Sequence, residues 1–193
     1  MLNLYCKEIG GVWCGAALDG TKVFATTFTS SKKEAIRYLL GSVPYNMHFQ
    51  EAEKIDATAD KLLQTIKAIV DGKDVSFSFE LAMERVPPYY RRVLEVMSLI
   101  PTGYVATYGG LAKVSGGGAR AVGNACATNP FPPIVPCHRV VAADMTLGGY
   151  GGGLKTKWAI LQRENRGYKD VSNVRIKGKL LPLYPISYLR PPV

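Results

Sequence analysis

A cysteine and a histidine stand side by side in an irregular, proline-rich segment of the sequence. Residues 129–141 read NPFPPIVPCHRVV, with Cys137 directly before His138. A cysteine reacts as its thiolate, and a nearby imidazole can accept the proton directly or through a water molecule. Because adjacent side chains of an extended segment point to opposite sides, we expect a bridging water. The segment predicts nucleophilic chemistry at Cys137.

Such a pair also needs a third group that orients the base, and Glu164 is the candidate carboxylate. A cysteine beside a histidine is far more often structural than catalytic, so the pair alone is weak evidence. The prolines around it favour catalysis, because they fix the backbone of a long irregular segment and could thereby position a nucleophile. They are Pro130, Pro132, Pro133 and Pro136.

Two short predicted helices precede this segment, over about 108–114 and 119–128, with a glycine-rich turn at 115–118 between them. This is the helix-turn-helix pattern, in which the second helix usually reads DNA. The second helix carries small residues around Arg120, its only long polar side chain. Such a helix suits close approach to a minor groove with an inserted side chain, although tight packing in a core would need the same residues.

Composition and charge limit the class of protein. The chain of 193 residues has a net charge of +9, which favours a polyanionic partner although many basic proteins bind no nucleic acid. No apolar run approaches the roughly 20 residues that span a bilayer, and the N-terminus does not resemble a secretory signal. We expect no membrane partner and a cytoplasmic protein, or a nuclear one in a eukaryote.

The four cysteines are too scattered for a disulfide framework, and neither a CxxC spacing nor a supply of histidines supports a metal site, so we predict no metal. Cys6 and Cys14 flank Gly10-Gly11. A two-residue turn there places the thiols on opposite faces of a hairpin, whereas a three-residue turn places them directly across from each other. Free thiols are favoured, and a disulfide is the alternative.

The first part of the chain reads as a small α+β unit without recognisable chemistry. Strands are expected over about 2–5, 12–18 and 22–29. Helices are expected over about 32–40 and 58–71. Ser30-Ser31 offers an N-cap for the first helix, while Gly41 and Gly72 would end the two helices. We place a domain boundary near residue 80.

The second part begins with a helix that starts at Pro87-Pro88 and ends at Pro101-Thr102-Gly103. A further helix is expected over about 154–165, after a glycine-rich loop at 148–153. The tail from 168 to 193 has no strong periodicity and is rich in lysine, arginine and proline. It is either an extension that packs on the body or a mobile basic arm.

The segment PCHRV, Pro136 to Val140, resembles the active-site motif of the O6-alkylguanine-DNA alkyltransferases. The resemblance runs from about Tyr89 to Gly167 and is looser before it. It implies an α+β fold with a ribonuclease-H-like α/β unit carrying a small sheet over 1–80. A mostly helical domain with the helix-turn-helix follows over 81–170, and a basic, proline-containing extension over 171–193.

The resemblance also implies roles for the residues of the segment. Cys137 would take an alkyl group from O6-alkylguanine in double-stranded DNA, with His138 as the water-mediated base and Glu164 orienting it. Asn129 would brace the segment through hydrogen bonds to backbone. A thioether has no good leaving group, so each molecule, expected to be a monomer, would act once and need no cofactor. Activity on O4-alkylthymine stays open.

The remaining implied roles concern DNA and the substrate pocket. Tyr108 would rotate a DNA phosphate, and Arg120 would enter the minor groove to replace the flipped base. Trp158 would be structural. The other implied DNA contacts are Ala119, Ala121 and Gly123, and the implied pocket residues are Pro132, Val140, Tyr150, Gly151 and Gly152.

The sequence departs from the family pattern at three positions. Gly151 stands where serine is frequent, and Asn124 and Cys126 replace small or apolar residues of the recognition helix. Three rival functions differ from alkyl transfer. They are a lesion-binding protein that transfers nothing, a dimeric helix-turn-helix regulator, and a cysteine hydrolase that would also need an oxyanion hole.

Overall fold

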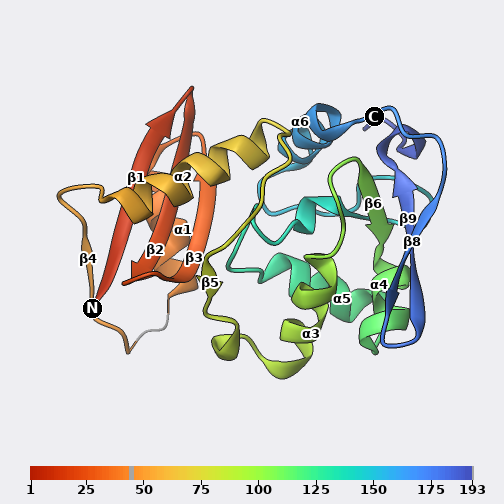
Figure 1. Ribbon diagram of the computed structural model, residues 1–193, viewed down its shortest axis with the longest axis horizontal. Helices are drawn as coiled ribbons and strands as arrows, with labels where there is room; N and C mark the ends of the chain where they lie inside the picture. Colours follow the sequence, from red (N-terminus) through yellow and green to blue (C-terminus); the bar gives the residue numbers. More distant parts are fainter. Residues whose placement is uncertain (44–45, 193) are drawn as a thin grey trace. The chain divides into compact units, whose positions relative to one another are not determined.

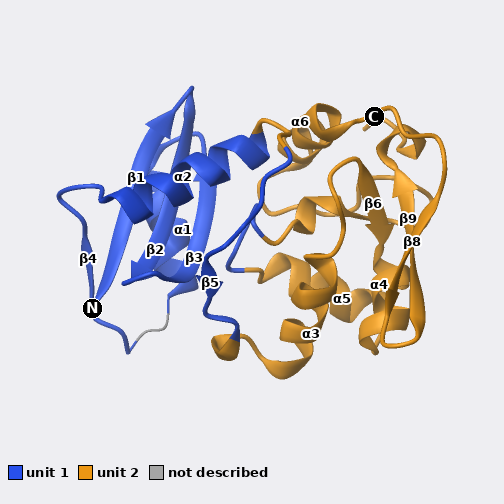
Figure 2. Cartoon of the chain, viewed as in Figure 1, with its two compact units in different colours: residues 1–70, 74–83, 130–134 blue, residues 71–73, 84–129, 135–193 orange. Residues whose placement is uncertain are grey.

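The computed structural model describes residues 1–43 and 46–192, which divide into two compact units (Figure 2). The first unit comprises 1–70, 74–83 and 130–134, and the second comprises 71–73, 84–129 and the described residues from 135 onward. The boundary inferred near residue 80 lies close to the end of the 74–83 stretch. The sequence did not indicate that 130–134 belongs with the first unit. Of the two alternatives for the tail, the structure shows the extension that packs on the body, because 171–192 belongs to the second unit.

The first unit is a five-stranded sheet with a helix on each face (Figure 1). Its sheet has the order β4-β1-β2-β3-β5, in which β1, β2 and β3 are antiparallel and the two edge strands are parallel to their neighbours. The elements are β1 (Leu2–Ile9), β2 (Val12–Asp19), β3 (Lys22–Thr29), α1 (Lys32–Ser42), β4 (Phe49–Glu51), α2 (Ala57–Val70) and β5 (Glu80–Leu81).

Alternation along β1 explains why the two helices cover opposite faces. Leu2 and Leu4 pack with Leu39 of α1. Tyr5 and Lys7, which point to the other face, reach the N-terminal end of α2, where the Tyr5 hydroxyl donates to Asp56 at 2.8 Å. Both faces of the sheet are therefore covered, and its strands carry apolar residues on both sides.

The hairpin between β1 and β2 has the two-residue turn. Gly10 and Gly11 both have positive φ, 54° and 76°, which only glycine adopts readily. The register then pairs Lys7 with Cys14, so Cys6 and Cys14 lie on opposite faces. All four cysteines are free.

Side-chain caps set the helix starts in this unit. The Ser31 hydroxyl accepts from the backbone N–H of Glu34 at 3.3 Å, and the Asp56 carboxylate accepts from that of Ala59 at 2.8 Å. The prediction that Gly41 ends the first helix was wrong, because α1 continues through it to Ser42. One glycine costs a helix only about 1 kcal/mol, which packing of α1 on the sheet outweighs.

The second unit combines four helices with a four-stranded sheet of order β7-β6-β9-β8 (Figure 1). The α+β class is confirmed, and the part expected to be mostly helical contains this sheet as well. The elements are η1 (Met83–Arg85, which begins at the unit boundary), α3 (Pro88–Met97), β6 (Tyr104–Thr107), α4 (Tyr108–Ser115), α5 (Ala119–Ala127), η2 (Cys137–Arg139), β7 (Val140–Val141), α6 (Leu154–Glu164), β8 (Ser172–Ile176), β9 (Lys179–Pro185) and η3 (Ile186–Tyr188).

The tail forms the β8-β9 hairpin, and β9 pairs with β6. Leu181, Leu183 and Pro185 alternate inward along β9. The residues between them are also apolar or proline, so the two-residue period was hidden in the sequence. Because β6 runs directly into α4, this sheet holds the start of the helix pair. Within 1–43 and 46–192, no helix is both long and apolar enough to cross a membrane.

Candidate active site

The reactive segment is a single buried 3-10 turn of the second unit. In η2 the backbone N–H of Cys137 donates to the carbonyl of Val135 at 2.8 Å and that of Arg139 to Pro136 at 2.9 Å. The expectation of an extended segment was therefore wrong. Successive side chains of a 3-10 helix are about 120° apart, so Cys137 and His138 still point in different directions. The Cys137 side chain is almost fully enclosed, with 7% of the residue exposed.

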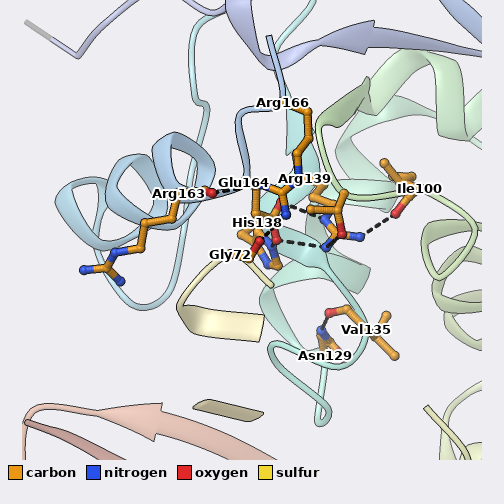
Figure 3. Close-up of polar contacts among 10 residues, drawn as sticks. Gly72, Ile100, Asn129, Val135, His138, Arg139, Arg163, Glu164 and Arg166 are labelled. Atoms are coloured by element: carbon orange, nitrogen blue, oxygen red, sulfur yellow. Dashed lines mark hydrogen bonds and ion pairs between the residues drawn. The ribbon is translucent and has the colours of Figure 1, made fainter. Parts of the chain in front are cut away.

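His138 and Glu164 form a fully buried pair (Figure 3). The imidazole Nε2 lies 2.9 Å from a carboxylate oxygen of Glu164, the last residue of α6. Burial alone would raise the pKa of Glu164, but the charges and hydrogen bonds of His138 and Arg139 lower it to about 2. Glu164 is therefore ionised and accepts the hydrogen bond from Nε2–H.

This contact fixes which nitrogen of His138 is the base. With the proton on Nε2, the lone pair is on Nδ1, which is buried and forms no hydrogen bond with the described residues. Burial lowers the pKa of His138 more than the carboxylate of Glu164 raises it. The ring is thus neutral near pH 7 and can accept a proton at Nδ1.

Arg139 is a residue of the site to which the sequence analysis gave no role. Its guanidinium donates to both carboxylate oxygens of Glu164, from Nε at 2.9 Å and from Nη2 at 2.8 Å (Figure 3). It also donates to the Ile100 carbonyl at 2.6 Å and the Thr102 hydroxyl at 3.1 Å. The fork of donors holds Glu164 in one orientation and keeps it charged.

Asn129 closes the loop that precedes the reactive turn. Its side-chain amide donates to the Val135 carbonyl at 2.9 Å (Figure 3), and a further side-chain hydrogen bond joins it to Cys137. Burial raises the pKa of the Cys137 thiol, while Asn129 and the charge of Lys157 oppose the rise only in part. The thiol is therefore protonated at rest, and its reaction depends on a base.

Lys157 is a second buried cation that the sequence analysis did not single out. Its ammonium donates to the carbonyls of Val140 and Leu147 at 2.6 Å and of Gly149 at 3.3 Å. Burial lowers the pKa of Lys157 to about 8. Lys157 thus ties the strand after the reactive turn to the loop that begins at Leu147.

Tyr108, the first residue of α4, lies against the same loop. Its hydroxyl donates to the Gly149 carbonyl at 3.3 Å, and a Cβ on Gly148 would lie 2.8 Å from its ring. Burial raises the pKa of Tyr108 to about 12, and the thiolates of Cys126 and Cys137 add to the rise. The phenol therefore keeps its proton and can donate it in a hydrogen bond.

The implied pocket residues differ in their burial and in the unit to which they belong. Val140 is fully buried in β7, while Tyr150 lies beside Lys157, whose ammonium is 5.9 Å from the ring centroid. Gly151 and Gly152 are exposed. Pro132 belongs to the first unit, where its carbonyl accepts from the Thr26 hydroxyl at 2.9 Å.

The exposed face of α5 is nearly without side chains. Arg120, Asn124 and Ala127 are exposed along it, and a Cβ on Gly123 would contact nothing within 4 Å. Val122 and Ala125 are buried on the opposite face, with Ala121 half-buried and Ala119 exposed at the start. The backbone of α5 can therefore come close to a partner, with Arg120 projecting from it.

This fold and this cysteine define a group-transfer protein in which a buried thiol, an oriented neutral imidazole and a bare, exposed helix share one unit. The family model described as "6-O-methylguanine DNA methyltransferase, DNA binding domain" matches residues 88–166. The methylated-DNA–protein-cysteine methyltransferase of Methanocaldococcus jannaschii is 35% identical over 160 residues, which cover 81% of this chain and 90% of that protein. The chain belongs to this family, which confirms the resemblance carried by PCHRV.

Two further relatives support the assignment. The methyltransferase of the same name from Methanothermobacter thermautotrophicus is 43% identical over 105 residues, which cover 54% of this chain and 60% of that protein. Among solved structures, Mycobacterium tuberculosis OGT in complex with DNA has a TM-score of 0.65 and 28% identity, covering 85% of this chain and 92% of that one.

Proposed function

We propose that this chain repairs DNA by direct reversal, moving the alkyl group of O6-alkylguanine irreversibly onto Cys137. The observation that carries the proposal is the buried Cys137 beside a neutral His138 that Glu164 orients, in a family of methylated-DNA–protein-cysteine methyltransferases. Cys137 is the catalytic residue, and Glu164, Arg139 and Asn129 are positioning residues.

The transfer needs one proton movement and one displacement. Nδ1 of His138 takes the proton of the Cys137 thiol through a bridging water, and Glu164 stabilises the imidazolium that forms. The thiolate then attacks the alkyl carbon. A carbon–sulfur bond forms, and the bond from that carbon to O6 breaks with its electron pair remaining on guanine. Guanine takes up one proton from water, and the His138 imidazolium returns to water the proton that it took from Cys137.

The product explains why each molecule is used once. The thioether on Cys137 has no good leaving group, and no base in the site can regenerate the thiol. No step in this sequence calls for a cofactor. The protein is consumed in proportion to the lesions that it removes.

Access to the lesion requires that the base leave the duplex, because the O6-alkyl group cannot reach a buried thiol from inside the stack. The exposed face of α5 supports this step, since its small residues allow close approach to a groove and Arg120 can fill the space of the displaced base. Tyr108, at the start of α4, would help to rotate a DNA phosphate and donate a hydrogen bond to the guanine ring. Double-stranded DNA is thus the partner, and we propose a monomer.

Intact-protein mass spectrometry tests the transfer directly. After incubation with a duplex containing one O6-methylguanine, the wild type should gain a single methyl group, located on Cys137 by peptide mapping. Cys126→Ser, which removes the neighbouring half-buried thiol, should gain the same methyl group, and Cys137→Ser should gain none. An unchanged mass with retained binding to the lesion would show a lesion-binding protein instead.

A further inference from the structure

The C-terminal hairpin carries a group of basic side chains that the site described above does not use. Arg175, Lys177 and Lys179 lie around the turn between β8 and β9, and all three are exposed. The Lys179 ammonium donates to the carbonyl of Lys113, an exposed residue in the last turn of α4, at 3.0 Å. We call these four residues, Lys113, Arg175, Lys177 and Lys179, the basic tip. Figure 1 shows the hairpin turn beside α4.

The charge of the basic tip is not neutralised by any carboxylate of residues 1–43 and 46–192. Among the residues that the structure describes, no carboxylate forms an ion pair with any of its members. Arg175 is opposite Leu180 in the register and Lys179 is opposite Ile176, so these two side chains leave opposite faces of the hairpin. The turn therefore carries positive charge on both faces. The hairpin also lies outside residues 88–166, the part that the family model matches.

The conformation of Lys177 is a second, independent observation. Lys177 and Gly178 form the two-residue turn, and Lys177 has φ of 48°, a left-handed conformation that glycine or asparagine adopts more readily. Lysine there is strained, and a residue held in such a conformation is a reason to look for a function. The turn therefore places a charged side chain at a position where glycine or asparagine would be less strained.

The fold ties the basic tip to the helix pair. The hairpin is attached through β9 to β6, and β6 runs into α4 without a loop. Lys113 is followed within a few residues by the turn at Gly116–Gly118 and then by the exposed start of α5, where Ala119 and Arg120 lie. A duplex that lies on the exposed face of α5 and continues past the turn at Gly116–Gly118 would bring its phosphates to Lys113 and the hairpin.

We propose that the basic tip binds DNA phosphates outside the lesion and lengthens the contact with the duplex. This inference rests on the proposed action on DNA. Phosphate contacts carry no sequence information, so the tip would raise affinity for any duplex and fix the position of the helix pair on it. It would leave the chemistry at Cys137 unchanged.

The test compares two variants with the same loss of charge. The tip variant is Arg175→Gln/Lys177→Asn/Lys179→Gln, in which asparagine suits the left-handed turn position. The control is Arg37→Gln/Lys33→Gln/Lys54→Gln, which removes one arginine and two lysines exposed on the first unit. Affinity for an undamaged duplex is measured over a range of NaCl concentrations, together with the rate of reaction with free O6-benzylguanine.

We expect the tip variant to lose about 2–3 from the slope of log K against log[salt], since each phosphate contact contributes about 0.9. Its affinity in low salt should fall at least about tenfold, while the control variant keeps the wild-type slope. Both should react with free O6-benzylguanine at the wild-type rate, which shows that the fold and Cys137 are intact. Arg175→Gln alone should give about one third of the change in slope and serves if the triple variant misfolds.

Two outcomes would overturn the proposal. One is a wild-type slope for the tip variant, and the other is an equal loss for the control variant. If the wild-type slope comes with loss of binding to vesicles of phosphatidylserine and phosphatidylcholine, the tip is assigned to a lipid surface instead. In each case the transfer to Cys137 would still be judged separately, by the mass of the reacted protein.

Discussion

Several residues of this site orient their neighbours through their charge, and burial strengthens these electrostatic interactions. Glu164 is ionised although fully buried, because Arg139 and His138 surround it with donors. Lys157, equally enclosed, has three carbonyl oxygens for its ammonium in place of a carboxylate. A buried charge with its hydrogen bonds satisfied orients its neighbours, whereas the same charge without partners would unfold the unit.

Lys157→Met tests this role at the residue scale. At pH 7 the ammonium stays protonated, because burial lowers its pKa only to about 8. Methionine keeps the volume and removes the donors, so we expect the free energy of unfolding to fall by about 1–3 kcal/mol, the cost of unsatisfied buried carbonyls. Urea denaturation measures this change.

The same variant should react more slowly with free O6-benzylguanine, because the loop of Leu147 and Gly149 would lose its tie to Val140. Lys155→Met, on the exposed side of α6, is the matched control and should behave as the wild type in both measurements. If both variants have wild-type stability and rate, Lys157 does not hold the loop.

The sequence contains a signal for the buried position of Lys157. Lys157, Ile160, Leu161 and Glu164 recur at helical spacing and form the buried face of α6. A lysine on such a face is an outlier. Arg139, in contrast, had no signal beyond its place in PCHRV, because its partners Ile100 and Thr102 are distant in sequence. Glu164 was found only as a candidate for the orienting carboxylate and through the family resemblance.

At the scale of elements, α5 differs from an ordinary packed helix in having a bare exposed face. Small residues cost a helix little when alanine is used, and they leave the backbone accessible. Gly123 lies inside the helix, and a Cβ added to it would have no neighbour within 4 Å, so packing does not require a glycine there. This fits the proposed close approach of DNA to α5.

Arg120→Ala separates base flipping from chemistry in α5. If Arg120 fills the space of the displaced guanine, its loss should slow reaction with O6-methylguanine in duplex DNA by about 10- to 100-fold, the equivalent of a few kcal/mol of unstacking. Reaction with free O6-benzylguanine should stay at the wild-type rate. Rapid-quench measurement of the second-order rate constant on both substrates gives the comparison.

Arg37→Ala, an exposed arginine of α1, is the control and should leave both rate constants unchanged. Equal losses of rate on duplex and free base would mean that Arg120 supports the structure of α5. In that case the flipping role would pass to another residue of the exposed face.

The elements that the sequence predicted well are those with local signals. Ser31 capped α1, Pro88 began α3, and the glycines at 116–118 separated α4 from α5 as expected. Strands β6, β7 and β9 were missed because they are short or uniformly apolar and gain their hydrogen bonds from distant segments. Strand pairing of this kind depends on tertiary contacts that no local window contains.

At the scale of the whole molecule, the buried charges of the site should make folding sensitive to acid. The pKa of Glu164 is about 2 in the folded chain, against an ordinary value of 4.5, so the stability it provides is complete above pH 4.5 and is lost as the pH falls toward 2. The lowered pKa of His138 acts in the same direction below pH 6.5, because the unfolded chain takes up a proton that the folded chain refuses.

We therefore expect the free energy of unfolding to decline from about pH 6.5 downward, with Glu164 accounting for about 3 kcal/mol between pH 4.5 and 2. Glu164→Gln should be less stable at pH 7, since Arg139 loses its counter-ion, and its stability should change less across pH 4.5 to 2. Urea denaturation at a series of pH values tests this, with the exposed Glu53→Gln as a control that should run parallel to the wild type. A stability curve of Glu164→Gln that runs parallel to the wild-type curve would show that the buried carboxylate does not govern acid stability. It would also contradict the argument that Glu164 orients His138 as an ionised carboxylate.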